Sequence, residues 1–234
     1  RAPQGGHSSP GQQAQPRSFL VHWFYDPEIT ESSTAIFERE LKHFKALRIR
    51  NDDQIVITNG LGVSHKAVVV DVSSGQIRLL AKSIANEQSV TIHLVQALAK
   101  GGRDEAAVQT ACELGVASVT PFQAKRSIVE WGSKTARNQE RWHQIAVSAM
   151  KQSQQSFLPT TGSLSTAKDL VGSGLKLVLD PGAEKSLSEI DLSPEITIVV
   201  GPEGGFEAGE LNLLMSNGFK AVRLGNSVLR TSSA

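Results

Sequence analysis

Three short segments of this chain have the residue types of a small-molecule binding site. Each begins with an apolar run and continues into a loop rich in glycine, proline or other small residues. The segments are Leu177–Glu184, Ile198–Phe206 and Leu224–Thr231. In open α/β folds ligands bind at loops that follow the carboxyl ends of strands, and small residues let backbone groups approach the ligand closely. The sequence therefore predicts three strand-end loops around one pocket.

The middle loop, Gly-Pro-Glu-Gly-Gly at 201–205, restricts the class of ligand. It has neither the Gly-Lys-Ser/Thr of a phosphate-binding P-loop nor the G-x-G-x-x-G of a dinucleotide site. The carboxylate of Glu203 would repel a phosphate and would favour a ligand with a positive centre, such as the sulfonium of S-adenosylmethionine. Taken alone, the loop is explained about equally well as a plain tight turn.

The elements that must position these loops follow from hydrophobic periodicity. From Thr91 onward apolar runs alternate with helical patterns, which predicts an α/β domain with a mostly parallel sheet. The expected strands are 91–97, 118–121, 175–180, 196–200 and 221–224. The expected helices are 103–114, 135–155 and 207–217. In the first helix Ala107, Ala111 and Leu114 form one apolar face.

The second helix is predicted to be the longest, and it has two distinct faces. Its apolar face consists of Trp142, Ile145, Ala146, Ala149 and Met150, at helical spacing. The other face carries cations that include Arg137, Arg141 and Lys151. Such a face is most often simply solvated, but it could also contact RNA phosphates, which Arg and Lys neutralise.

The first third of the chain has a different pattern. Strand-like runs at 19–25, 54–58, 65–71 and 76–80, with turn signals at Asn59-Gly60 and Ser74-Gly75, predict a small β-barrel or curled sheet. A short helix is expected at 37–47. Residues 1–17 have no periodic apolar positions, so they are interpreted as a disordered leader or a cloning remnant.

Composition excludes several classes of protein. The 24 Lys and Arg residues nearly balance the 23 Asp and Glu residues, so a nucleic-acid site must be a local patch. Cys112 is the only cysteine and the six histidines are scattered, which excludes a disulfide framework and a Cys-cluster zinc site and indicates no metal. No apolar run approaches the roughly 18 residues that span a membrane. We therefore expect a cytoplasmic protein with no membrane contact.

Several motifs, taken together, resemble one family. The pair Gly-Pro-Glu-Gly-Gly at 201–205 and Leu-Gly-x-x-x-Leu-Arg-Thr at 224–231 is the most specific of them. Further matches are Lys100–Glu105, Ala111–Val116, Arg141–Ile145, His43–Arg48 and Asp52–Val56. From Phe19 to Ala234 the chain closely resembles the RsmE family, the small-subunit ribosomal RNA uridine-N3 methyltransferases of the SPOUT superfamily.

The resemblance implies a fold and an activity. It implies an α/β fold with a PUA-like, RNA-binding β-barrel at 18–86 and a SPOUT methyltransferase domain at 87–234, whose parallel sheet forms a trefoil knot. It also implies a homodimer that uses S-adenosylmethionine to methylate N3 of a uridine in 16S ribosomal RNA of the small subunit. Two rival interpretations are a non-catalytic RNA-binding protein on this scaffold and a related methyltransferase that acts on transfer RNA.

Residue roles come from the same resemblance. The cofactor-binding positions are Leu179, Gly201, Pro202, Glu203, Gly204, Leu224, Gly225 and Leu229. Because the three loops contain no histidine, we expect Arg230 to stabilise negative charge on the uracil carbonyls, although an ion pair across a dimer is the alternative. Glu203 either accepts the N3 proton or steadies the sulfonium. The expected RNA contacts are Arg48 or Arg50 on the small domain and Arg126, Arg137, Arg141 and Lys151 on the large one.

The chain departs from the family pattern at two places. Gln155 stands where family members commonly have an arginine, which puts one RNA contact in doubt. After Thr231 the chain has Ser-Ser-Ala, whereas the family continues with a helix of about five turns that completes the knot, covers the cofactor and forms the dimer interface. We expect that helix to be missing. Either the chain was cut, or its tail is disordered, or this form of the protein holds the cofactor poorly.

Overall fold

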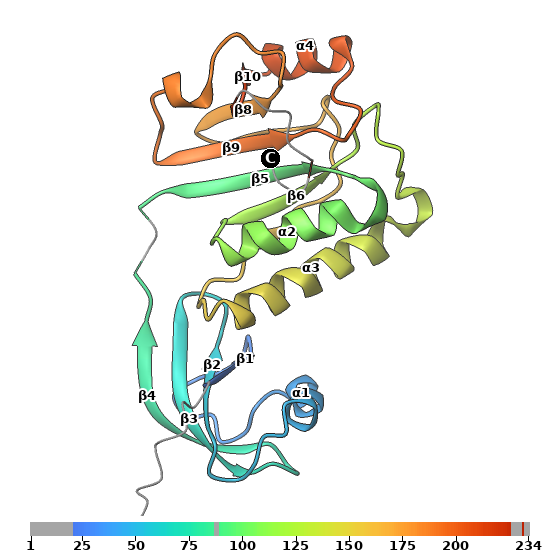
Figure 1. Cartoon of the computed structure of the whole chain (residues 1–234). Helices are drawn as coiled ribbons and strands as arrows, with labels where there is room; N and C mark the ends of the chain where they lie inside the picture. Colours follow the sequence, from blue (N-terminus) through green and yellow to red (C-terminus); the bar gives the residue numbers. More distant parts are fainter. Residues whose placement is uncertain (1–20, 87–88, 226–230, 232–234) are drawn as a thin grey trace, which may run out of the picture.

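The computed structural model describes residues 21–86, 89–225 and 231, which form two sheets connected by a single crossing of the chain (Figure 1). The first sheet has the order β1-β2-β3-β4. Its strands are β1 (His22–Tyr25), β2 (Gln54–Thr58), β3 (Val63–Asp71) and β4 (Gln76–Ile84). The first pair is parallel and the other two are antiparallel. The strands expected at 54–58, 65–71 and 76–80 are confirmed, and β4 continues four residues past its predicted end. Of the strand expected at 19–25, the part from His22 to Tyr25 is confirmed, and residues 19 and 20 lie outside the described residues.

The small sheet packs around a hydrophobic core of its own. In β3, Ala67 and Val69 are fully buried, as expected for a strand with one face toward the interior. The helical stretch that the sequence predicts divides into a 3-10 turn, η1 (Glu38–Glu40), and a short helix, α1 (Leu41–Ala46). Phe44 of α1 meets Phe24 of β1 edge to face, with ring centroids 4.8 Å apart. Helix and sheet therefore share one core.

The second sheet has six strands in the order β10-β8-β9-β5-β6-β7, and every pair is parallel. The strands are β5 (Thr91–Ala97), β6 (Ser118–Phe122), β7 (Thr160–Thr161), β8 (Leu175–Leu179), β9 (Glu195–Val200) and β10 (Lys220–Val222). The predicted parallel α/β architecture is confirmed. The sequence did not predict β7, because two residues are too few to show a period.

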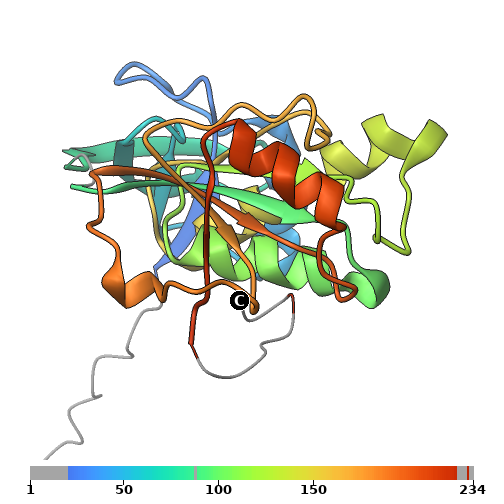
Figure 2. The ribbon, with the colours of Figure 1, turned by 90° about the horizontal axis from the view of Figure 1, so that it is seen from above.

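Helices cover both faces of this sheet (Figure 2). Helices α2 (Arg103–Glu113) and α3 (Thr135–Gln152) pack on one face, where Leu94 and Val119 belong to their core. Helix α4 (Ala208–Ser216) packs on the other face, where Val95 and Val199 lie. Successive residues of β5 thus serve opposite layers.

Helix α3 buries the face that its periodicity predicts. Trp142, Ala146, Ala149 and Met150 are buried, and Trp142 meets Trp131 edge to face at 5.4 Å between ring centroids. The helix ends at Gln152, three residues before its predicted end, and Gln154 then takes a left-handed φ of 58°.

The apolar face predicted for α2 is only partly buried. The buried positions are Asp104, Ala107, Val108 and Cys112, whereas Leu114, just beyond the helix, is 82% exposed. The stripe formed by Ala107, Ala111 and Leu114 instead borders an open cavity. Periodicity identified an apolar face correctly but could not say whether protein covers it.

The two sheets are joined by backbone hydrogen bonds as well as by the connecting chain. The segment that follows α3 runs along the loop between β2 and β3. There the Gly62 amide donates to the Ser156 carbonyl at 2.9 Å, and the Leu158 amide donates to the Gly60 carbonyl at 2.8 Å. Gly62 has a φ of 89°, and a Cβ at this position would lie 2.5 Å from the Phe157 ring. Only glycine therefore fits this junction without rearrangement.

Cys112 should be chemically inert in the folded protein. Its side chain is fully buried in the α2–α3 core, and this burial raises the pKa of the thiol to about 12. Because the thiolate is the reactive form, Ellman's reagent at pH 8 is expected to titrate no thiol in the native protein and one per chain in urea. A Thr110→Cys variant, with its new thiol on the exposed side of the same helix, should react at once. Rapid modification of the native wild-type chain would contradict the prediction.

Candidate functional site

A cavity of about 700 Å³ lies on the face of the large sheet that is turned toward α2, and it extends from Ser89 and Ile92, at the start of β5, to the carboxyl ends of β5, β8 and β9. The pairing registers place Val222, Leu179, Val200 and Gln96 in one row across β10, β8, β9 and β5. Leu179, Val200 and Gln96 from this row line the cavity, together with Leu224 just after β10. The structure thus gathers Leu179 and Leu224, two of the cofactor positions expected from the sequence, around one space.

The opposite wall of the cavity is the outer stripe of α2, with Ala107, Thr110, Ala111 and Leu114. Among the described residues that line the cavity none is charged, and the polar side chains there are Ser89, Gln96 and Thr110. An apolar space with very few polar groups suits a flat, mostly apolar ligand whose orientation is set by those groups. None of these described residues would offer a cation to a phosphate.

The glycine loop begins directly beside this wall, because Gly201 follows Val200. A Cβ at Gly201 would lie 2.8 Å from the ring of Phe206, which itself meets Phe122 edge to face at 6.3 Å between centroids. Gly205 has a φ of 64° and its amide donates to the Pro202 carbonyl at 2.9 Å. Close packing at one end and a left-handed turn at the other account for these two glycines.

Two arginines from other parts of the large domain hold the glycine loop. The guanidinium of Arg103, at the start of α2, pairs with the Glu203 carboxylate at 3.0 Å. The guanidinium of Arg126 donates to the Gly204 carbonyl at 3.1 Å. Neither contact could be predicted from the sequence, because the partners lie 100 and 78 residues apart along the chain. Glu203 is therefore a paired carboxylate beside the cavity and does not line it.

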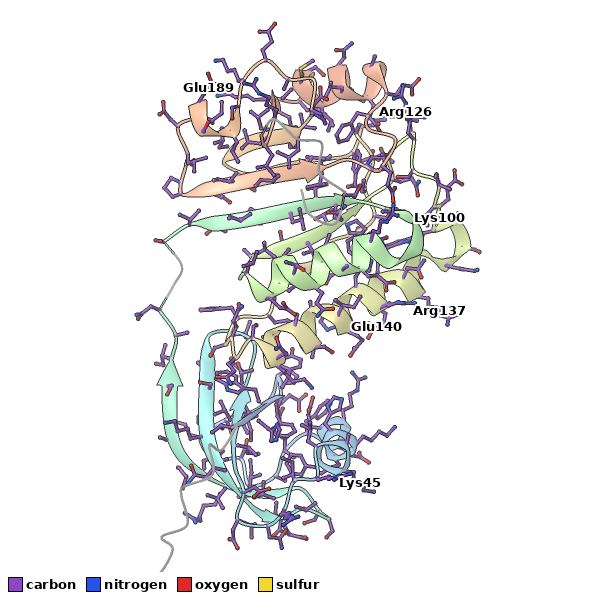
Figure 3. All side chains as sticks on the ribbon, viewed as in Figure 1. Lys45, Lys100, Arg126, Arg137, Glu140 and Glu189 are labelled. Atoms are coloured by element: carbon purple, nitrogen blue, oxygen red, sulfur yellow. The ribbon has the colours of Figure 1, made fainter. Side chains whose placement is uncertain are left out.

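The cations expected to contact RNA are mostly exposed. Arg126 and Arg137 project, with Lys100, toward the same edge of the large domain (Figure 3). Arg141 is exposed as well, and it pairs with Glu105 at 2.6 Å. On the small domain, Arg48 and Arg50 are exposed. The arginines of the predicted RNA surface are thus exposed to solvent, and Arg126 and Arg141 also contact protein partners.

Lys151 does not belong to that surface. Its side chain is only 13% exposed, and its Nζ lies 3.0 Å from Oε1 and 3.2 Å from Oε2 of Glu40, which is buried in the small domain. His43 Nδ1 lies 3.0 Å from the same ammonium. The sequence suggested an RNA contact because Lys151 follows the polar face of α3, but that part of the face meets the small domain.

Gln155 also has a structural role. Its Nε2 donates to the carbonyls of Cys112 and Glu113 at 3.2 and 2.7 Å, so it satisfies backbone acceptors at the end of α2. An exposed arginine at this position, as expected from the family pattern, would leave those carbonyls without this donor.

Two of the predicted functional residues, Leu229 and Arg230, lie outside the described residues. Within the described ranges, no three His, Cys, Asp or Glu side chains are grouped so that they could hold a metal ion. No helix there combines the length and the apolar character needed to cross a bilayer.

Comparison with known proteins places the chain among RNA-modifying enzymes. A family model described as an RNA methyltransferase domain matches residues 86–234, and one described as an RNA methyltransferase PUA domain matches residues 38–81. The chain is 33% identical to the ribosomal RNA small subunit methyltransferase E of Mycobacterium bovis, over 80% of this chain and 76% of the relative. With the enzyme of the same name from Synechocystis it shares 28% identity over 97% of this chain and 79% of the relative.

A solved structure is similar over almost the whole fold. It is that of a ribosomal RNA small subunit methyltransferase E from Neisseria gonorrhoeae bound to S-adenosylmethionine. The match has a TM-score of 0.81 at 28% identity and covers 92% of this chain and 93% of the other.

Proposed function

Because the chain belongs to the RNA methyltransferase family that includes ribosomal RNA small subunit methyltransferase E, we propose that it methylates small-subunit ribosomal RNA with S-adenosylmethionine as the methyl donor. The product is N3-methyluridine in 16S ribosomal RNA. The observation that carries the proposal is the apolar cavity between α2 and the strands β5, β8 and β9, with Leu179 and Leu224 on its wall.

The residues around this cavity fit an adenosyl cofactor. Leu179 and Leu224 offer apolar contacts to a heterocycle, and the glycine loop at 201–205 lets backbone groups come close to the rest of the molecule. The further positions that we assign to the cofactor are Gly201, Pro202, Glu203, Gly204, Gly225 and Leu229. When bound, S-adenosylmethionine supplies an electrophilic methyl group on a positively charged sulfur.

The protein must hold uracil N3 in line with that methyl group and help N3 lose its proton. Glu203 is the carboxylate of the glycine loop, and its pairing with Arg103 holds it in one place beside the cavity. We propose that Glu203 either accepts the N3 proton or stabilises the sulfonium. Arg230 stabilises the negative charge that develops on the uracil carbonyl oxygens.

The RNA surface extends over both domains. Arg126, Arg137 and Arg141 bind phosphates on the large domain, and Arg48 and Arg50 bind them on the small one. These contacts position the RNA without reading its sequence. The partner is 16S ribosomal RNA, either free or within the small ribosomal subunit.

Finer features of the architecture belong to the same proposal. We place the domain boundary at 86/87, with residues 18–86 closing as a PUA-like barrel and residues 87–234 forming a trefoil-knotted SPOUT domain. The protein acts as a homodimer in the cytoplasm. Support comes from the family match of both regions and from the parallel six-stranded sheet.

Mass spectrometry of ribosomal RNA tests the reaction. The full chain is incubated with S-adenosylmethionine and either 16S ribosomal RNA or small subunits from cells that lack the modification. We expect N3-methyluridine at a single site. Binding of RNA without any binding of S-adenosylmethionine in calorimetry would favour the non-catalytic protein. Methylation of transfer RNA alone would favour the related transfer RNA enzyme.

The role of Arg230 is tested by an alanine substitution. Because it removes a fixed cation from developing negative charge, Arg230→Ala should lower kcat about 100-fold and leave the affinity for S-adenosylmethionine within a factor of three. Arg137→Ala, at a phosphate contact, should raise the KM for RNA and leave kcat unchanged. Full activity of Arg230→Ala, with a changed sedimentation coefficient, would assign Arg230 to an ion pair across the dimer instead.

A further inference from the structure

The loop that follows β6 presents one exposed apolar side chain. Within residues 123–131, all of which the structure describes, Ile128 is 74% exposed, whereas Trp131 is buried and Val129 packs against the α2–α3 core. A single exposed isoleucine is common on protein surfaces and by itself indicates nothing. Ile128 differs from such a residue in how firmly its loop is held and in what surrounds it.

Hydrogen bonds hold the loop on both sides of Ile128. On one side the Ser127 hydroxyl donates to the Leu98 carbonyl at 3.0 Å. On the other side the Gln123 Nε2 donates to the Val129 carbonyl at 3.0 Å. The two neighbours of Ile128 are therefore fixed to the protein while its own side chain stays in solvent. A side chain on a fixed backbone loses little further freedom when it enters another molecule.

The loop is also attached to the glycine loop of the candidate site. Arg126, two residues before Ile128, donates to the Gly204 carbonyl at 3.1 Å. A Cβ at Gly204 would lie only 3.2 Å from the Cβ of Arg126, so the two backbones run close together. Two residues of chain span at most about 7 Å, which places Ile128 beside the entrance to the site.

The same edge of the large domain carries an excess of positive charge. Three of its cations, Lys100, Arg126 and Arg137, project together in Figure 3. Of the carboxylates there, Glu130 is exposed and Glu203 is already paired with Arg103. An apolar side chain among cations suits a polyanion that also offers apolar surface. RNA is such a partner, because it has phosphates for the cations and a base stack for the isoleucine. The exposed basic residues at this edge are Lys100, Lys125, Arg126, Lys134 and Arg137.

The proposed reaction creates a need for an apolar side chain at this place. N3 of uridine lies on the edge of the base that pairs with other bases, and the base itself is stacked between its neighbours. To bring N3 to the methyl group the protein must take the uracil out of the stack, which costs unstacking energy. Proteins that open a base step often fill the gap with an apolar wedge, and isoleucine is one of the residues that they use.

We propose that Ile128 inserts into the base stack of the RNA beside the target uridine and holds open the gap that the uridine leaves. Lys125 and Arg126 bind the phosphates on either side of that gap. This inference rests on the proposed function, because only a reaction on a base requires the base to leave the stack. Ile128 is thus a positioning residue for the RNA and has no contact with the cofactor.

Steady-state kinetics on small ribosomal subunits that lack the modification test the inference with the full chain. Ile128→Ser should lower kcat about 30-fold, because the opened state of the RNA loses its wedge. The KM for RNA should change less than about threefold, since the phosphate contacts remain. Ile128→Leu keeps the apolar bulk and should keep kcat within about threefold.

Val171→Ser is the matched control. Val171 is 89% exposed, but it precedes β8, whereas Ile128 follows β6. Because the strands are parallel, the two side chains lie at opposite edges of the sheet. Val171→Ser removes the same kind of exposed apolar group far from the candidate site, and its kcat and KM should match those of the wild type.

Two further measurements separate the proposed role from a structural one. Because the Ile128 side chain is exposed, Ile128→Ser should unfold at the same urea concentration as the wild type. It should also bind S-adenosylhomocysteine with unchanged affinity in calorimetry. A lower unfolding midpoint or weaker cofactor binding would assign Ile128 to folding or to the cofactor site and would overturn the inference.

Each remaining failure has a distinct meaning. The inference is wrong if Ile128→Ser keeps the kcat of the wild type, if it changes only the KM for RNA, or if Ile128→Leu is as defective as Ile128→Ser. In all three cases the wild-type chain still forms N3-methyluridine, so the proposed function stands. A wild-type chain that forms no N3-methyluridine contradicts the proposed function, and the inference falls with it.

Discussion

Gly174→Ala is expected to lower the free energy of unfolding by about 4 kcal/mol or more, the largest effect that we predict for any single methyl group in this chain. A Cβ at this position would lie 2.1 Å from the Glu195 carbonyl oxygen and 2.6 Å from its carbon. Both are backbone atoms at the start of the β8–β9 pairing, so no side chain can move aside. The φ of 61° adds a conformational cost.

The backbone around Gly174 has little freedom to relieve the collision. The hydroxyl of Thr197 donates to the Ser173 carbonyl at 2.9 Å, and the Ser173 amide donates back to the same hydroxyl at 2.9 Å. Thr197 is itself buried within β9. The loop before β8 is therefore held against the neighbouring strand from both directions.

Urea denaturation followed by circular dichroism measures this effect, and Gly101→Ala is the matched control. Gly101 has a φ of 71°, but a Cβ there would contact nothing within 4 Å. Its substitution should cost only the conformational term, about 1 kcal/mol. If the two variants unfold at the same urea concentration, the collision at Glu195 is not real. Should Gly174→Ala fail to fold, the soluble yield of the two variants gives the same comparison.

Lys151→Met is expected to destabilise the protein by about 3 kcal/mol, because it leaves the Glu40 carboxylate buried without its main cation. The Glu40 side chain is 6% exposed, and its two oxygens share the ammonium of Lys151 across the boundary between the sheets. A buried charge that loses its partner costs far more than the pair contributes while intact.

Arg141→Met on the same helix is the control for that experiment. Arg141 pairs with Glu105, but its side chain is 64% exposed, so water replaces the lost partner and the cost should stay below about 1 kcal/mol. In addition, the double variant Lys151→Met, Glu40→Leu should recover much of the stability, since it removes both charges. Equal destabilisation by Lys151→Met and Arg141→Met would contradict the distinction between the two pairs.

The sequence predicted best where an apolar pattern was long. The run at 91–97 became β5 with both ends as predicted, because Ile92, Leu94, Val95 and Ala97 give it the apolar character of a strand inside a parallel sheet. The apolar face of α3 was identified for a similar reason, since Trp142, Ala146, Ala149 and Met150 repeat over several turns. A long apolar pattern of this kind predicts by itself which residues are buried.

Prediction failed where the answer depends on what lies opposite. Ala111 and Leu114 have the spacing of a core face, yet they face a cavity, and Lys151 has the spacing of a solvent face, yet it faces Glu40. The neighbouring sequence contains no feature that distinguishes a face turned to protein from a face turned to a cavity or to solvent. The pairing of Arg103 with Glu203 is equally invisible in the sequence, because it requires the start of α2 to lie beside the loop after β9.

Some residues of the candidate site could be predicted from the sequence, and others could not. Leu179 and Leu224 could be placed at one pocket because parallel strands end at the same edge of a sheet. Gln96 also borders the cavity but gave no signal, since a polar residue inside an apolar run is ordinarily interpreted as a tolerated exception.

The strand order of the large sheet has a consequence for how the chain folds during its synthesis. β9 lies between β8 and β5, so the centre of the sheet cannot assemble until residue 200 has emerged. The small sheet needs only residues up to Ile84, and its antiparallel strands are neighbours along the chain. We therefore expect the small domain to fold early on the nascent chain. At that stage β5 and β6 have been synthesised, but their apolar residues remain exposed until β9 emerges. During that interval the protein is most exposed to aggregation and most dependent on chaperones.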